Sequence, residues 1–168
     1  MAWPARPPMP ALHKVTATEM AAVLDEIERL GTQLWKRKPT DQIVNNSSAL
    51  VNDSSLFLSL LAGKDYRVGA LIFHISGTVP DIQMQWTLSG GGGMVSGGQG
   101  QVGTYQNQYN TGGITVYDGI ASNMVTVFDG TLVTAAAGTL QLKWAQITPT
   151  VSDTKVLANS HVWAEQMT

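Results

Sequence analysis

The chain has 168 residues, no cysteine and a net charge of −2, and only 13 % of its residues are charged. Soluble domains usually carry about 25 % charged residues. The composition excludes disulfides and thiolate metal sites, and it lacks the basic balance that nucleic-acid binding needs. No apolar run of membrane-spanning length and no signal-peptide core is present. We therefore expect synthesis and assembly in a cytoplasm, with no membrane insertion.

The first 15 residues are expected to form an extended arm. Four of the first ten are proline, which fixes φ and lacks the backbone donor of a helix or central strand. Two interpretations stay open, a solvated tail or a segment laid against a partner. A solvated tail rarely carries large apolar side chains, and this one has three, which we take as candidate anchoring residues: Trp3, Met9 and Leu12.

Residues 16–39 are predicted to form an amphipathic helix followed by a linker. Thr16 and Glu19 have the spacing of a capping box, Lys36–Lys38 would lie where cations favour a helix C-terminus, and Pro39 stops further helix. Five apolar residues follow the 3,4 spacing of a coiled coil: Met20, Val23, Ile27, Leu30 and Leu34. A helix this short is marginal alone, so its own domain or partner chains must cover the stripe. We take these residues as a candidate oligomer interface.

Residues 40–168 are predicted to be mainly β, forming an antiparallel sandwich or jelly roll of roughly eight strands. The strand signals are alternating or continuous apolar runs, and no helical pattern interrupts them. They lie at residues 56–60, 68–75, 82–88, 114–117, 125–128, on both sides of the turn at 135–138, and at 155–163.

The clearest of these signals is the segment 129–146. Leu140, Leu142 and Trp144 alternate with Gln141, Lys143 and Ala145, which is the period of a half-buried strand. Small residues at 135–138 provide a chain reversal before it. We interpret the segment as a β-hairpin with one wet and one dry side.

Residues 90–113 hold ten of the 17 glycines, and no charged residue occurs from Ile82 to Tyr117. The simpler interpretation is a flexible or tightly turning surface loop pair. The functional one is a contact loop in which Tyr105, Tyr109 and Tyr117 meet a ligand among Gln and Asn side chains.

No pattern of residues predicts catalysis. Gly98–Gly103 matches G-x-G-x-x-G, but a turn-rich stretch follows it where the nucleotide motif needs a helix. The histidines are far apart in sequence. His74 lies in an apolar strand and is interpreted as an interior residue, and His161 as an ordinary strand residue. We therefore expect no enzyme activity, no metal and no cofactor.

Two segments resemble small virion structural proteins of tailed bacteriophages. They are GTLVTAAAGTLQLKWAQ at Gly130–Gln146 and VLANS at Val156–Ser160. The resemblance implies a virion protein, trimeric like many such phage domains, with the β domain projecting outward. The arm and helix would anchor it to the capsid or another virion protein. The alternatives kept open are a capsid decoration or head-fibre protein, and a tail-associated module that binds a host cell-surface glycan.

Overall fold

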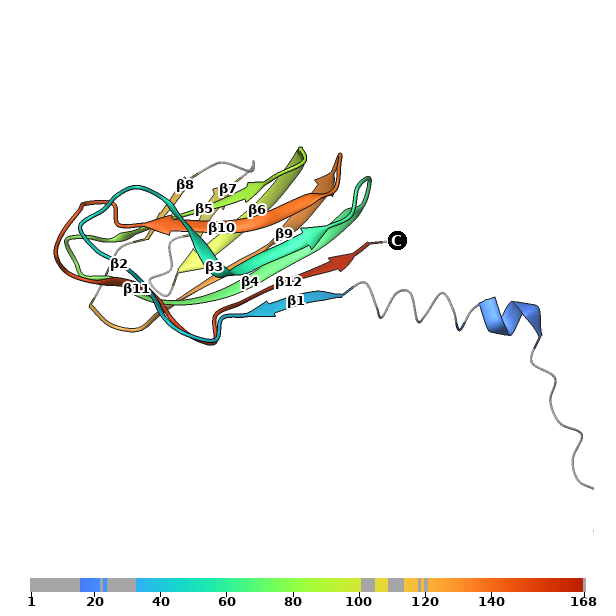
Figure 1. Cartoon of the computed structure of the whole chain (residues 1–168), viewed down its shortest axis with the longest axis horizontal. Helices are drawn as coiled ribbons and strands as arrows, with labels where there is room; N and C mark the ends of the chain where they lie inside the picture. The colour runs from blue at the N-terminus through green and yellow to red at the C-terminus, as the bar shows by residue number, and fades with distance from the viewer. Residues whose placement is uncertain are drawn as a thin grey trace, which may run out of the picture. The chain divides into compact units, whose positions relative to one another are not determined.

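The computed structural model describes residues 16–21, 23, 33–100, 105–108, 114–117, 119 and 121–167. The chain divides into two compact units, residues 1–31 and 32–168. The first unit contains helical residues at 17–21 and 23, and the second contains the strands (Figure 1).

Thr16 and Glu19 form the reciprocal hydrogen bonds of a capping box. The Thr16 amide donates to Glu19 Oε2 at 2.8 Å, and the Glu19 amide donates to Thr16 Oγ1 at 3.2 Å. These reciprocal bonds satisfy donors that a helix start leaves without intrahelical partners. Met20 and Val23 are 50 % and 52 % exposed. Ile27 and Leu30 lie outside the described residues, as do Trp3, Met9 and Leu12 of the predicted arm.

The second unit is built from two antiparallel sheets, as the sequence predicted. The eight-stranded sheet runs in the order β1-β12-β4-β9-β6-β7, with β11 pairing β4 and β2 pairing β11; the four-stranded sheet runs in the order β3-β10-β5-β8. Figure 1 shows the two sheets as separate layers. The strands are β1 (Leu34–Arg37), β2 (Gln42–Val44), β3 (Val51–Leu60), β4 (Asp65–Ile75), β5 (Ile82–Leu88), β6 (Gly92–Gly100), β7 (Tyr105–Gln108), β8 (Ile114–Tyr117), β9 (Met124–Thr134), β10 (Gly138–Ala145), β11 (Thr154–Val156) and β12 (His161–Gln166).

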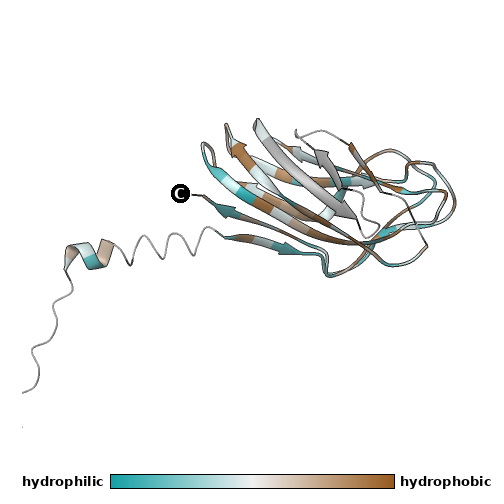
Figure 2. Cartoon of the chain, turned by 180° about the vertical axis from the view of Figure 1, so that it is seen from behind, coloured by the Kyte–Doolittle hydropathy of each residue, from teal (hydrophilic) through white to brown (hydrophobic). Residues whose placement is uncertain are grey.

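One hydrophobic core lies between the sheets and takes residues from both. Hydrophobic and hydrophilic residues alternate along the strands (Figure 2), so each strand turns one side inward. Trp86 of β5 meets Phe128 of β9 edge to face, with ring centroids 5.6 Å apart. Trp144 of β10 is fully buried. The expected dry sides of β3, β5 and β10 are confirmed.

The predicted hairpin at 129–146 is wrong. Its strands β9 and β10 belong to different sheets: β9 pairs with β4 and β6, and β10 pairs with β3 and β5. The reversal at 135–137 carries the chain from one layer to the other. Both strands still turn a dry side to the core, because Leu132 and Leu140 face the same interior from opposite sheets.

The simpler interpretation of residues 90–113, a surface loop pair, is wrong for the two strands in this segment. Residues 92–100 form β6 and residues 105–108 form β7. β6 runs along nearly all of β9, from Gly92 opposite Thr134 to Gly100 opposite Thr126, and β7 pairs with β6. Backbone hydrogen bonds to β9 organise this segment even though glycine has a low strand propensity.

Leu34 and the cations after it also differ from the prediction. Leu34 lies in β1, opposite Ala164 of β12, and packs against the core of the β unit. It does not continue the helical stripe. Lys36 and Arg37 are strand residues and not the end of a helix, because their backbone pairs with Val162 and His161 of β12. This tertiary pairing outweighs the local preference for a helix.

Lys38 follows β1 and forms a fully buried ion pair with Asp53 of β3. Its Nζ lies 2.9 and 2.8 Å from the two carboxylate oxygens and 3.1 Å from Gln42 Oε1. The carboxylate also accepts the Leu56 amide and the Trp144 indole N–H. Each carboxylate oxygen of Asp53 therefore accepts hydrogen bonds from at least two donors. A buried charge needs such partners to offset the loss of its hydration. The pair joins the edge of one sheet to the other.

Candidate interaction surface

The tyrosines of the predicted contact loop do not form a described site. Tyr105 lies in β7 and Tyr117 in β8, on different sheets, and their side chains lie outside the described residues, as does Tyr109. Within the described part of the chain, no three His, Cys, Asp or Glu side chains gather as a metal site would require. No helix among the described residues is long and apolar enough to cross a membrane.

The outer face of the eight-stranded sheet carries an unusual set of apolar residues. We use the name aromatic face for a set of outward side chains on β1, β12, β4 and β9: Trp35, His161, Trp163, Leu71, Phe73, Val125 and Val127. Trp35 is 55 % exposed and Val127 is 45 % exposed, and the others are partly exposed. Their sequence neighbours Val162, Ala70, Ile72 and Phe128 point into the core, so alternation places this set outward.

Strand register aligns part of this face in one row across the sheet. Trp35 lies opposite Trp163, Trp163 opposite Gly69, and Gly69 opposite Asp129. The Trp163 indole occupies the space above Gly69: a Cβ at position 69 would lie only 2.3 Å from Trp163 Cζ2. Glycine at this position lets the indole lie close to the sheet.

Arg67 links three strands on the same face. Its Nη2 lies 3.2 Å from Asp129 Oδ2 on β9, and its guanidinium carbon lies 5.6 Å from the Trp163 ring centroid on β12. The hydrogen bond to Asp129, followed by the attraction of its charge, raises the pKa of Arg67. Both partners are more than half exposed, so this pair orients side chains more than it stabilises the fold.

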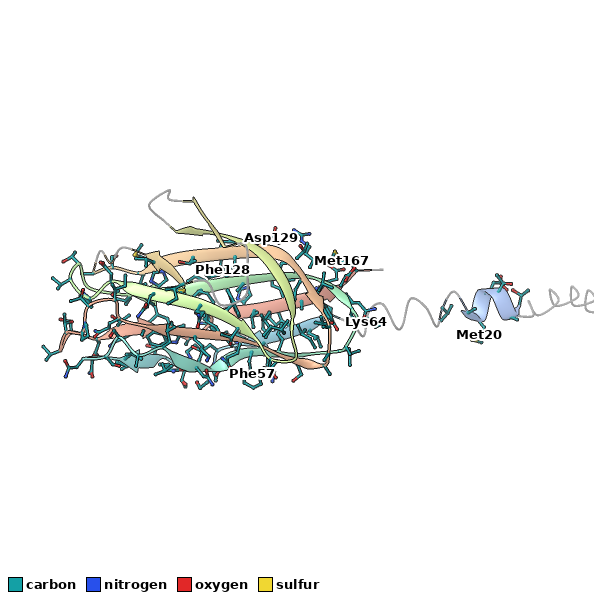
Figure 3. All side chains as sticks on the ribbon, turned by 90° about the horizontal axis from the view of Figure 1, so that it is seen from above. Met20, Phe57, Lys64, Phe128, Asp129 and Met167 are labelled. Atoms are coloured by element: carbon teal, nitrogen blue, oxygen red, sulfur yellow. The ribbon has the colours of Figure 1, made fainter. Side chains whose placement is uncertain are left out.

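Beside this pair is a shallow open hollow of about 190 Å³, lined by Arg67, Asp129, Gly130, Thr131 and Met167. Figure 3 shows Asp129 and Met167 close together and Phe57, of the other sheet, on the opposite side of the body. At the other end of the row, the Trp35 and His161 rings lie 6.0 Å apart. The face therefore combines flat aromatic surface with a charged hydrogen-bonding group.

The outer face of the four-stranded sheet differs in chemistry. Its outward residues on β5 and β10 are amides and hydroxyls with one cation, namely Gln83, Gln85, Thr87, Thr139, Gln141 and Lys143. On the edge strand β8, Ile114 and Val116 are 54 % and 41 % exposed. Several of the amides are engaged within the chain: Gln141 Nε2, for example, donates to the carbonyls of Asp53 and Leu142.

His74 is an interior residue, as predicted. It is fully buried in β4, and its Nε2 lies 3.0 Å from Thr126 Oγ1 of the adjacent strand β9. Burial lowers its pKa from 6.5 to about 4, because desolvation penalises the charged imidazolium. His74 therefore belongs to the interior of the β unit and is not part of an outer face.

The sequence interpretation missed the aromatic face, although one signal for it was present. His161, Trp163 and Glu165 alternate with Val162 and Ala164, which predicts a strand with an aromatic outer side. Nothing in the sequence placed Trp35 and Arg67 on that same side, since register depends on pairing between distant strands. No family model matches the chain, and no curated protein matches its sequence.

Proposed function

We propose that this chain is a non-enzymatic structural protein of a tailed-bacteriophage virion, a trimeric capsid decoration or head-fibre protein. The observation that carries the proposal is the two-unit build. A capped helix exposes Met20 and Val23 at heptad spacing. A separate β unit holds the two segments that resemble virion proteins, one in β9–β10 and one that begins at the last residue of β11.

The arm and helix would attach the protein to the particle and set its symmetry, while the β unit faces outward. Met20 and Val23 leave an apolar stripe that a neighbouring helix would cover. A two-sheet body with few charges and a satisfied buried ion pair is a rigid support for an exposed surface.

We further propose that the β unit is a jelly roll. In that arrangement β1-β12-β4-β9 forms one four-stranded layer and β3-β10-β5-β8 the other, and consecutive strands mostly change layer. β6 and β7 are then an insertion between β5 and β8 that extends the first layer beyond β9, and β2 and β11 are short additions.

The test is localisation in the assembled particle. Cryo-EM of particles carrying a tagged chain, with antibody bound to the tag, is expected to place the protein on the head surface with three-fold symmetry. Density on the tail tip would overturn the head assignment. Absence from purified particles, checked by mass spectrometry, would overturn the virion proposal itself.

A second candidate function is a tail-associated module that binds carbohydrate. The exposed Trp35 and the Arg67–Asp129 pair beside Trp163 favour it, because sugars present apolar C–H surfaces to aromatic rings and hydroxyls to charged groups. A glycan array probed with the full chain tests this candidate. Binding that Trp163→Ala abolishes would support it, and no binding at high protein concentration would contradict it.

A further inference from the structure

The aromatic face exposes large apolar side chains to solvent in the single chain, which is unfavourable unless a partner covers them. We infer that it is an interface between copies of this chain, an inference that rests on the trimer in the proposed function and names the surface that the copies share. Its occupant is a neighbouring β unit.

The first argument is the kind of residue on this face. Trp35 of β1 and Val127 of β9 are about half exposed in the single chain. The two strands between them, β12 and β4, turn Trp163, Leu71 and Phe73 outward. A contiguous apolar patch on a soluble protein marks a contact surface. Aromatic residues are enriched, and charged residues depleted, at the centre of protein interfaces.

The second argument is charge around the patch. The outward charges beside it carry both signs: Arg37 and Arg67 are basic, and Asp65, Asp129 and Glu165 are acidic. A surface with both signs can pair with another copy of itself without net repulsion. A cyclic assembly brings one part of this surface against a different part on the next copy, so opposite charges have partners there.

The third argument is the position of β1 in the chain. Trp35 follows Val23 by only 12 residues, and β1 is the first strand of the β unit. Extended chain spans at most about 3.5 Å per residue. Copies joined through the heptad stripe would therefore hold their β1 strands within reach of one another. The patch begins on that strand, since Trp35 lies directly opposite Trp163.

Thiol labelling of the full chain tests the inference, because the natural sequence has no cysteine. Val127→Cys places one thiol on the aromatic face, and Val116→Cys places one on the outer side of the other sheet. The two valines are matched in exposure, at 45 % and 41 %. Maleimide labelling of native protein is expected to be at least about tenfold slower for Val127→Cys, and equal for both variants in denaturant. Light scattering on the same samples is expected to give a trimer mass.

The possible outcomes distinguish the aromatic-face interface from the trimer of the proposed function. A trimer mass with equal labelling rates overturns the aromatic-face interface and leaves the helix-mediated trimer standing. A monomer mass overturns both. In the background Met20→Asp with Val23→Asp, a retained trimer mass with slow labelling of Val127→Cys keeps the aromatic-face interface and overturns the role of the helix.

Discussion

Gly69 of β4 and Trp163 of β12 are paired directly across the sheet, and the indole fills the space where a side chain at position 69 would stand. The aromatic face therefore depends on the missing side chain of Gly69 as well as on the large side chain of Trp163. The absence of a side chain on one strand lets a large ring on the next lie close to the sheet, beside Arg67.

Gly69→Ala is expected to destabilise the β unit by about 1–3 kcal/mol, the usual cost of overpacking. The added Cβ would lie 2.3 Å from Trp163 Cζ2, so the indole must move. Urea denaturation followed by circular dichroism measures the change. In a Trp163→Ala background the same substitution is expected to be neutral or stabilising, since glycine in a strand costs roughly 0.5–1 kcal/mol relative to alanine. An equal loss in both backgrounds would show that the two residues are not coupled.

Lys38→Met is expected to lower the free energy of unfolding by about 3–5 kcal/mol, because it leaves the buried Asp53 carboxylate without its counter-ion. Lys36→Met is the matched control two residues away, where the side chain is exposed above the Phe57 ring. Its loss is expected to stay below about 1 kcal/mol. Equal losses in the two variants would contradict the assignment of Lys38–Asp53 as the critical pair.

His74 is expected to make the fold sensitive to acid. Its folded pKa of about 4 lies below the ordinary 6.5, so the unfolded chain takes up a proton first as the pH falls. The contribution is absent above pH 6.5, and stability falls between pH 6.5 and 4 by about 3 kcal/mol in total. Denaturation of the wild type and of His74→Gln across this range measures it. A variant that keeps the full wild-type slope would contradict the assignment.

Thr16→Ala is expected to reduce helical content without changing the unfolding of the β unit. It removes the hydroxyl that accepts the Glu19 amide, and loss of such a cap costs about 0.5–2 kcal/mol. Far-UV circular dichroism of the full chain and the midpoint of β-unit unfolding are the two readouts. Thr18→Ala is the control, because Thr18 lies two residues after Thr16, within the helical residues. This variant is expected to keep or raise the helical content, since alanine is the better helix former. Equal loss of helicity in the two variants would argue against the capping box.

Local patterns predicted much of this molecule. The capping box depends on residues three apart, and it is present as predicted. The dry sides of β3, β5 and β10 follow from alternation within each strand. The heptad spacing of Leu34 predicts a helical residue, but pairing with Ala164, about 130 residues later in the chain, places it in β1.

The sequence by itself determined which residues are helical at the cap, which side of each strand is dry, and that the body is mainly β, since these properties depend on neighbours within a few positions. Only the tertiary structure decided that β9 and β10 lie in different sheets, that Lys38 is buried against Asp53, and that Trp35, Trp163, Arg67 and Asp129 share one outer face. Alternation specifies two sides of a strand but not its partner or register. Those depend on the joint packing of strands that are distant in the chain.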